Sequence, residues 1–333
     1  MSDRLNIAYF VHGRGRGHAV RAQSVLAALE QKGYRLSVFG GGHATGVLGG
    51  RTDFRVVQPC LPGWDWLPSL SQRLIQDLGE LRKIRPALVI SDADMPSIHA
   101  AAILGIPSIG LGHGIVFSQT KLPKGLPRWG RIRESLNAGS SSWLCKRLIA
   151  VHFAPLVPID ASRVDVARPE LKALTEQDAI DEGFILTYFR DENGYKVLEQ
   201  LKRFGRRVVY FGHAEVPPGV ERHEPDAPQF ADHLRRCHAV VGSAGNHLPA
   251  ECALAGKPML ALYSKGDLEQ QMNAHLAQEA GIAMAEHLDR VDRAKLEEFF
   301  ETKLPTPNAV HALLEMRPVS DAVLETVAEI LAA

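Results

Sequence analysis

The feature that most constrains the fold is a strand–loop–helix pattern that occurs in both halves of the chain. In the first half, residues 5–11 form a near-continuous apolar run, and a glycine-rich loop then leads into a helix with apolar side chains on one face. In the second half, the apolar run 239–241, the loop 243–245 and a helix expected over 247–255 repeat this order. A buried strand followed directly by a helix is typical of parallel sheets. We therefore expect an α/β protein.

A third unit of the same kind lies between these two. Residues 87–91 are expected to form a strand and residues 97–104 a helix, and the strand expected over 107–111 ends just before His113. Together these elements form one βαβ unit of a parallel sheet. The chain has 333 residues, of which 45% are hydrophobic, and this is enough for two domains with separate cores.

Asp92 and Asp94 directly follow the first strand of this unit. Ligands bind beyond the carboxyl ends of the strands in an open parallel sheet, so both aspartates and His113 should face the same cleft as His18 of the first glycine loop. The alternative is that the aspartates cap the helix that follows them. Capping explains Asp94 as well as a site role does, but it explains Asp92 less well.

The first glycine loop has the spacing G-x-G-x-G-H over residues 13–18. A dinucleotide-binding fingerprint requires G-x-G-x-x-G and an acidic residue at the end of the second strand. The second strand expected here, over 35–39, is followed by three glycines and no carboxylate. Hydride transfer with NAD is therefore disfavoured. His18 either bonds to local backbone at the helix start or acts as a general base.

The loop 243–245 suits a diphosphate, because such a loop leaves backbone N–H groups unpaired at the positive end of a helix. Glu251 lies six residues past Gly245, where a carboxylate can accept both hydroxyls of a ribose. Gln270 and Gln271 begin another helix after the next strand, and their amides can reach sugar hydroxyls at the same rim. The alternative is an ordinary loop and helix of an α/β protein.

This pattern resembles the donor site of glycosyltransferases with the two-domain GT-B fold, above all family 28, whose best-known member adds N-acetylglucosamine to the lipid-linked cell-wall precursor. That family has a glycine loop, a ribose-binding glutamate six residues further on, and a Gln-Gln or Asp-Gln pair near Asn-Ala for the donor sugar. Gly245, Glu251, Gln270, Gln271 and the Asn-Ala pair at 273–274 follow that order.

The first glycine loop is similar to the first-domain loop of the same family, because it ends in Gly-His and Arg21 follows three residues later. A divergent group of short GT-B proteins with G-x-G-R-G-H near the start looks closest. One segment departs from the family pattern. A second glycine-rich loop is replaced by residues 188–194, where the Arg190 guanidinium is expected to hold a phosphate instead.

The resemblance implies two Rossmann-like parallel-sheet domains that face each other across a cleft. We expect an acceptor-side domain over residues 1–158, a linker over 159–182 and a nucleotide-sugar donor domain over 183–333. The final helix, expected over 320–332, either crosses back onto the first domain, as in GT-B enzymes, or stays on its own domain. Relatives work without a metal ion, so we expect neither a metal nor a cofactor.

The implied reaction transfers a sugar, with inversion, from a UDP-hexose or UDP-N-acetylhexosamine to an acceptor nucleophile. His18 is the expected general base and Asp92 the second candidate, whereas His113 and Asp94 belong to the acceptor side. The expected donor-binding residues are Gly15, Gly17, Arg190, Ser243, Ala244, Gly245, Asn246, His247, Glu251, Gln270 and Gln271. A sugar-nucleotide hydrolase or 2-epimerase, and a catalytically silent nucleotide-sugar-binding protein, are the alternatives on this fold.

The composition disfavours several other classes of protein. Lys and Arg total 38, as do Asp and Glu, so the net charge is zero, and no nucleic-acid-binding motif is present. The four cysteines form no C-x-x-C pair, which fits a reducing cytoplasm better than a disulfide framework or a structural zinc site. No signal peptide or membrane-spanning run is visible. We therefore expect a soluble cytoplasmic enzyme with no nucleic-acid partner.

The segment 121–147 carries seven basic residues and one acidic residue, Glu134, together with Trp129 and Trp143. In a chain of zero net charge, this local excess indicates an anionic acceptor or peripheral contact with the anionic inner face of a membrane. The alternative is a solvated face of a loop and helix.

Overall fold

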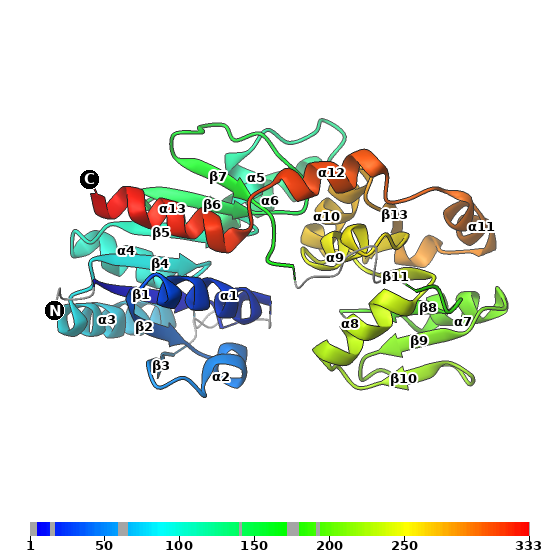
Figure 1. Cartoon of the computed structure of the whole chain (residues 1–333), viewed down its shortest axis with the longest axis horizontal. Helices are drawn as coiled ribbons and strands as arrows, with labels where there is room; N and C mark the ends of the chain where they lie inside the picture. Colours follow the sequence, from blue (N-terminus) through cyan, green and yellow to red (C-terminus); the bar gives the residue numbers. More distant parts are fainter. Residues whose placement is uncertain are drawn as a thin grey trace.

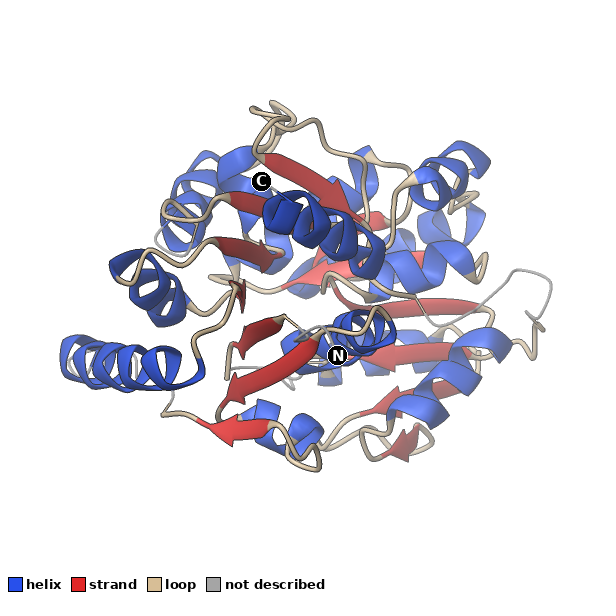
Figure 2. Ribbon diagram, turned by 60° about the vertical axis from the view of Figure 1, so that its left-hand side comes forward, coloured by secondary structure: helices blue, strands red, loops and turns tan. Residues whose placement is uncertain are grey.

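Two parallel sheets organise the chain, as the strand–loop–helix pattern predicts (Figure 1). The computed structural model describes residues 5–13, 17–58, 66–139, 142–171, 180–190 and 194–332. Within these ranges the first sheet has seven strands and the second has six. Helices cover both faces of the sheets (Figure 2), which is the doubly wound α/β architecture.

The N-terminal sheet has the strand order β3-β2-β1-β4-β5-β6-β7, with every neighbouring pair parallel. Its strands are β1 (Asn6–Val11), β2 (Arg35–Gly40), β3 (Phe54–Val56), β4 (Leu88–Asp92), β5 (Ser108–Gly112), β6 (Arg147–Val151) and β7 (Val164–Ala167). The strands expected over 5–11, 35–39, 87–91 and 107–111 are confirmed as β1, β2, β4 and β5. The sequence analysis did not identify β3, β6 and β7.

β7 lies inside the segment 159–182, which the sequence analysis expected to be a linker. It pairs with β6 and forms the edge of the N-terminal sheet. Its two end residues are buried and its two central residues are half-buried, which suits an edge strand. The N-terminal sheet therefore extends to Ala167, beyond the expected boundary at residue 158.

β1 is buried along its whole length because helices lie on both of its faces. Successive side chains of a strand point to opposite faces. Ile7 and Tyr9 accordingly pack with α1, whereas Ala8 and Phe10 belong to the cluster that includes α3 and α4. The helices of this domain are α1 (Gly17–Gln31), α2 (His43–Leu48), α3 (Trp66–Ile84), α4 (Met95–Ile103), α5 (Ile115–Gln119) and α6 (Arg128–Gly139).

The C-terminal sheet has the order β10-β9-β8-β11-β12-β13. Its strands are β8 (Ile185–Tyr188), β9 (Val208–Phe211), β10 (Glu221–His223), β11 (Ala239–Ser243), β12 (Met259–Tyr263) and β13 (Met284–His287). Its helices are α7 (Tyr195–Arg203), α8 (Ala227–Arg236), α9 (Leu248–Leu254), α10 (Leu268–Glu279), the 3-10 helix η3 (Leu288–Arg290), α11 (Arg293–Glu301) and α12 (Pro307–Glu315). The strand expected at 239–241 is confirmed as β11, and the helix expected at 247–255 is confirmed as α9.

The final helix, α13 (Val319–Ala332), crosses back onto the N-terminal domain (Figure 1). Val319, Val323 and Val327 lie at helical spacing and are buried in the same cluster as Ile7 and Tyr9. The periodicity of this helix left two placements open, on the N-terminal domain or on its own domain. The structure has the first, which is the placement expected from GT-B enzymes.

The two domains share a continuous apolar contact. One core cluster contains Val116 and Phe117 of α5 together with Ala244 and Met272 of the C-terminal domain. α6 packs on α10 so closely that a Cβ at Gly130 would lie 3.2 Å from the Met272 sulfur. Among the helices that the structure describes, none is both long and apolar enough to span a membrane.

Candidate active site

The ends of two strand pairs mark where a ligand can bind. If the strands are numbered from the start of each domain, so that β8 is the first strand of the second domain, both sheets contain the order 3-2-1-4-5-6. In such sheets the ligand crevice lies between the first and fourth strands, where the order reverses. In the N-terminal domain this position is between β1 and β4, which lead to His12 and Asp92. In the C-terminal domain it is between β8 and β11, which lead to Phe189 and Ser243.

A network of four polar side chains lies beyond β1 and β4. Asp92, the last residue of β4, is fully buried, and its Oδ1 lies 2.6 Å from His18 Nδ1. Arg21, one turn further along α1, donates from Nε to Asp92 Oδ2 at 2.9 Å and from Nη2 to Oδ1. The Tyr9 hydroxyl lies 3.4 Å from Asp92 Oδ2. The Asp92 carboxylate therefore positions both His18 and Arg21, the two polar side chains at the start of α1 that contact it.

The contacts of His18 Nδ1 assign the tautomer of its ring. Nδ1 lies 2.6 Å from the Asp92 carboxylate and 2.9 Å from Arg21 Nη2. If Nδ1 carried no proton, its lone pair would face the Asp92 oxygen at 2.6 Å, and the two electron-rich atoms would repel each other. We therefore place the proton on Nδ1, where it is donated to Asp92. The Nε2 lone pair of His18 is then available as a base.

Asp92 remains charged although it is buried. Burial by itself raises the pKa of this carboxyl, but the positive charge of Arg21 and the contact with His18 outweigh it and lower the pKa to about 2. Burial, with the negative charge of Asp92, raises the pKa of the Tyr9 phenol well above its usual range. The network is thus a neutral tyrosine, an anionic aspartate, a cationic arginine and a histidine.

The loop after β11 forms the opposite side of the site. The Ser243 hydroxyl accepts a hydrogen bond from the backbone N–H of Arg190 at 3.0 Å, which joins this loop to the end of β8. Within the described residues, the backbone N–H groups of Asn246 and His247 form no hydrogen bond. Apart from its two chain neighbours, no atom that the structure describes lies within 4 Å of where a Cβ at Gly245 would sit. The loop therefore presents backbone donors beside open space.

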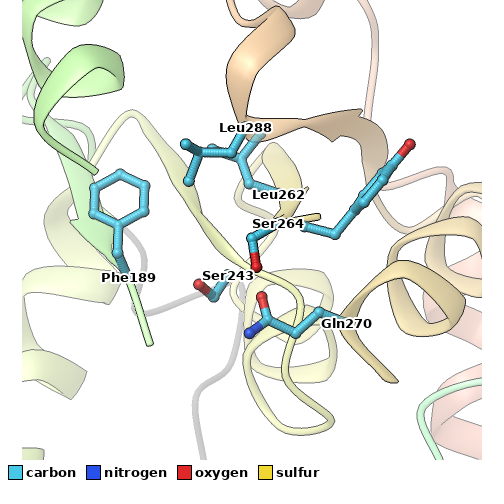
Figure 3. A pocket seen from close by; sticks show the side chains of 7 residues that line it. Phe189, Ser243, Leu262, Ser264, Gln270 and Leu288 are labelled. Atoms are coloured by element: carbon cyan, nitrogen blue, oxygen red, sulfur yellow. The ribbon is translucent and has the colours of Figure 1, made fainter. Parts of the chain in front are cut away.

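A small pocket adjoins this loop. Polar side chains lie on its lower side and apolar ones around its left and upper sides in Figure 3, and the labelled residues are Phe189, Ser243, Leu262, Ser264, Gln270 and Leu288. The amide of Gln270 points toward the hydroxyls of Ser243 and Ser264 (Figure 3). The pocket is thus a small recess beside the donor loop, with polar groups on one side and apolar groups on the other.

The start of α10 is fixed by its own cap. Asp267 accepts from the backbone N–H of Gln270 at 3.0 Å and from its side-chain Nε2 at 2.8 Å. Gln270 is therefore buried with its Oε1 left to accept a hydrogen bond, while Gln271 is partly exposed. Arg190 Nη1 lies 3.8 Å from Asp267 and 3.6 Å from Glu269. Arg190 and the two glutamines thus meet at one rim.

Two hydrogen bonds between the domains bring this rim to the His18 network. His113 Nε2 lies 2.8 Å from Asn273 Oδ1, and Asn246 Nδ2 donates to the Val151 carbonyl at 3.1 Å. Burial, followed by the positive charge of Arg21, lowers the pKa of His247 to about 3. Asn273 Nδ2 in turn donates to the Ala244 carbonyl at 3.1 Å. These hydrogen bonds hold the 243–247 loop against the carboxyl ends of β5 and β6, the strands that follow β4 in the same sheet.

Two residues expected on the acceptor side have other contacts. Asp94 caps α4 by accepting from the Ser97 N–H at 3.3 Å, and it also pairs with the buried Arg73 at 2.9 Å. This is the capping role left open by the sequence. His113 is buried in the domain contact rather than open to the cleft, and burial lowers the pKa of its imidazole.

The remaining expected residues are distributed around the site. Gly17 begins α1, where an added Cβ would meet no described residue beyond its chain neighbours within 4 Å. Glu251 is half-buried in the first turn of α9. Gly15 lies outside the described residues. The sequence analysis quoted Arg21 only as part of a motif and did not foresee its role, although its spacing from His18 places both on one helix face. It also missed Ser264 and Leu288.

The comparisons agree with this architecture. Residues 65–305 match the profile of glycosyl transferase family 1. No curated protein sequence matches the chain significantly.

Solved structures match over nearly the whole chain. MurG of Acinetobacter baumannii is 15% identical with a TM-score of 0.69, covering 98% of this chain and 99% of its own. The calicheamicin glycosyltransferase CalG4 is 14% identical with a TM-score of 0.71, covering 99% of both chains. UGT2 of Phytolacca americana, solved with UDP-2fluoro-glucose and pterostilbene, is 13% identical with a TM-score of 0.66, covering 99% of this chain and 100% of its own. These likenesses confirm the expected GT-B fold.

Replacing Asp92 by Asn should destabilise the protein, because it leaves Arg21 buried without its counter-ion. We expect a loss of about 3–5 kcal/mol in the free energy of unfolding at pH 7, measured with urea. The matched control is Tyr9→Phe, which removes one long hydrogen bond to the same carboxylate and should cost about 1 kcal/mol or less.

The same variant has an expected pH dependence. The folded pKa of Asp92 is about 2, below its ordinary value of 3.8, so its contribution to stability is present above that ordinary value and is lost as the pH falls toward 2. The difference between wild type and Asp92→Asn should therefore shrink on acidification. An Asp92→Asn cost no larger than that of Tyr9→Phe would contradict the assignment.

Proposed function

Because this chain belongs to glycosyl transferase family 1, we propose that it transfers a sugar from a UDP-sugar to an acceptor nucleophile, with inversion at the anomeric carbon. One observation carries the proposal. The His18–Asp92 pair lies at the switch point of one sheet, and the 243–247 loop at the switch point of the other is hydrogen-bonded to the same edge of that first sheet. A base and a diphosphate site on opposite sides of one cleft are what sugar transfer requires.

Two considerations favour UDP as the nucleotide. The order of Gly245, Glu251 and the Gln270–Gln271 pair is similar to the donor pattern of family 28. The Phytolacca americana neighbour, which shares the fold over 99% of this chain, was solved with UDP-2fluoro-glucose. We propose a hexose or an N-acetylhexosamine as the transferred sugar.

His18 starts the proposed reaction by taking the proton of the acceptor hydroxyl at Nε2. The acceptor oxygen then bonds to the anomeric carbon as the bond from that carbon to the diphosphate oxygen breaks, and the diphosphate leaves with the electron pair. The imidazolium keeps its Nδ1–H on Asp92, whose negative charge stabilises it. A single displacement of this kind inverts the anomeric configuration.

The C-terminal domain supplies the proposed donor contacts. The backbone N–H groups of Asn246 and His247 would bind the diphosphate, whose charge grows as it leaves. Glu251 would accept the ribose hydroxyls. Gln270 Oε1 and the Gln271 amide would bind the hexose, because Gln270 Nε2 is already donated to Asp267.

α6 offers a surface for the acceptor or for a membrane. One face of this helix packs on α10, and the other exposes Trp129, Ile132 and Leu136 at helical spacing, with Trp129 77% exposed. Arg128 and Arg133 are exposed on the same helix. Apolar side chains flanked by basic ones are typical of helices that lie on an anionic membrane surface. We propose that α6 binds anionic lipid that carries or surrounds the acceptor.

His18→Ala should lower turnover by about 100-fold or more, because it removes the base without touching the donor loop. The transfer rate is measured as UDP release, with the donor and acceptor first identified from a panel of nucleotide sugars. The UDP affinity should stay near wild type. The control is His311→Ala, an exposed histidine on α12, which should leave turnover unchanged. Near-normal turnover in His18→Ala would refute the assignment of His18 as the base.

Glu251→Ala should weaken UDP binding by about 2–4 kcal/mol, the range for lost charged hydrogen bonds in a cleft. Isothermal titration calorimetry with UDP measures this loss, and circular dichroism checks that the fold is retained. Gly245→Ala should also weaken UDP binding, because a methyl group there would enter the proposed diphosphate position without a close contact to the described residues beyond its chain neighbours. Glu315→Ala, on the exposed face of α12, is the control. Unchanged UDP affinity in both site variants would rule out this donor site.

Charge reversal on α6 should reduce binding to vesicles that contain anionic phospholipid. The variant carries Arg128→Glu, Arg131→Glu and Arg133→Glu, and sedimentation with vesicles is measured at low and high salt, because screening weakens such binding. The control reverses three exposed basic residues at the far end of the C-terminal domain: Arg290, Arg293 and Lys303. If wild type does not bind these vesicles, or the control loses as much binding, α6 is only a solvated face.

A further inference from the structure

Three potential metal ligands meet at the outer edge of the C-terminal sheet. Glu221 and His223 lie two residues apart on β10, and His233 lies on α8. One ligand atom of each residue lies within 4.8 Å of the other two. The sequence shows no familiar metal-binding motif here, because a strand and a helix bring the three side chains together.

The rings of both histidines are held in place. His233 is buried, and its Nδ1 lies 2.8 Å from the Gln229 carbonyl one turn earlier in α8, which assigns the proton to Nδ1 and leaves Nε2 as the ligand atom. The His223 ring stacks on Phe211 with centroids 5.0 Å apart, and the His233 ring meets Phe211 edge-on at 5.2 Å. These contacts fix two imidazoles beside each other, with their centroids 5.0 Å apart.

The carboxylate of Glu221 is oriented from its other side. Its Oε2 accepts from Arg207 Nη2 at 2.9 Å, and its Oε1 lies 2.8 Å from His223 Nε2. A cation bound by Oε1 and the two histidines would replace the hydrogen bond between Oε1 and His223 Nε2, whose proton would be released to solvent, and would leave the Arg207 contact intact. Arg207 would then be the outer partner that commonly supports a metal-bound carboxylate.

We propose that Glu221, His223 and His233 bind a divalent transition-metal ion of the Zn²⁺ class. Two imidazole nitrogens and one carboxylate oxygen suit Zn²⁺, Co²⁺ or Ni²⁺, whereas Mg²⁺ and Ca²⁺ prefer oxygen ligands alone. Three protein ligands leave the fourth position of a tetrahedral site for water. The ion would link β10, the edge strand of its sheet, to α8.

This site is independent of the proposed reaction. It lies at the edge strand β10, whereas the donor loop follows β11, across β9 and β8 in the same sheet. Metal binding should therefore stabilise the C-terminal domain without changing the affinity for UDP. One experiment can therefore refute the proposed metal site without refuting the proposed UDP-sugar site, and the reverse also holds.

Metal titration of the tag-free protein tests the proposal, since an affinity tag rich in histidine would itself bind zinc. After treatment with EDTA and its removal, ZnCl₂ is titrated by calorimetry, and CoCl₂ is titrated by visible absorption. We expect one ion per chain, the intense absorption bands of four-coordinate Co²⁺, and a melting temperature that rises with Zn²⁺. Millimolar MgCl₂ should not compete.

Variants show whether these three residues are the ligands. His223→Ala and Glu221→Gln should each weaken Zn²⁺ binding by at least about 10- to 100-fold, because even the loss of an outer partner has an effect of that size. Glu221→Gln preserves side-chain shape, so it remains informative if a histidine variant does not fold. His213→Ala is the control, because it removes an exposed histidine that pairs with Glu224 nearby. No stoichiometric binding, or equal binding by wild type and both ligand variants, would overturn the proposal.

Discussion

The geometry of the candidate site depends on a single buried charge, the carboxylate of Asp92. An isolated carboxylate in the core would be very unfavourable, so it must be paired and hydrogen-bonded. Arg21 supplies the pairing charge and His18 a further hydrogen bond, and both come from the first turns of α1. The requirement to compensate Asp92 thus fixes how α1 meets β4. It also fixes which nitrogen of His18 is held by the carboxylate.

The second half of the chain repeats the same arrangement with different chemistry. Its sheet has the same strand order, so its switch point also leads to a loop and a helix start. Here the loop offers backbone N–H groups instead of a buried ion pair. Hydrogen bonds from His113 and Asn246 cross between the domains and set the two switch points beside each other. This duplication places the proposed base and the proposed diphosphate loop on opposite sides of the candidate site.

Much of the architecture could be predicted because buried parallel strands are continuous apolar runs, as β1 and β11 show. Short or partly polar strands such as β7 and β10 lack that signal, so β7 was assigned to a linker. The His18–Asp92 pair could be anticipated, since strand ends in one parallel sheet meet at one edge. The contact of His113 with Asn273 could not, because it joins residues 160 positions apart in different domains. The cluster of His223 and His233 likewise depends on how α8 packs.

A crystal structure of the complex with UDP tests the central claim most directly, because it shows where the diphosphate lies relative to His18. The account predicts that the diphosphate oxygens lie within hydrogen-bond distance of the backbone N–H groups of Asn246 and His247. It also predicts that His18 Nε2 faces the side from which the sugar would extend, with Nδ1 still on Asp92. A diphosphate bound away from the 243–247 loop, or on the side of the loop that His18 does not face, would contradict it.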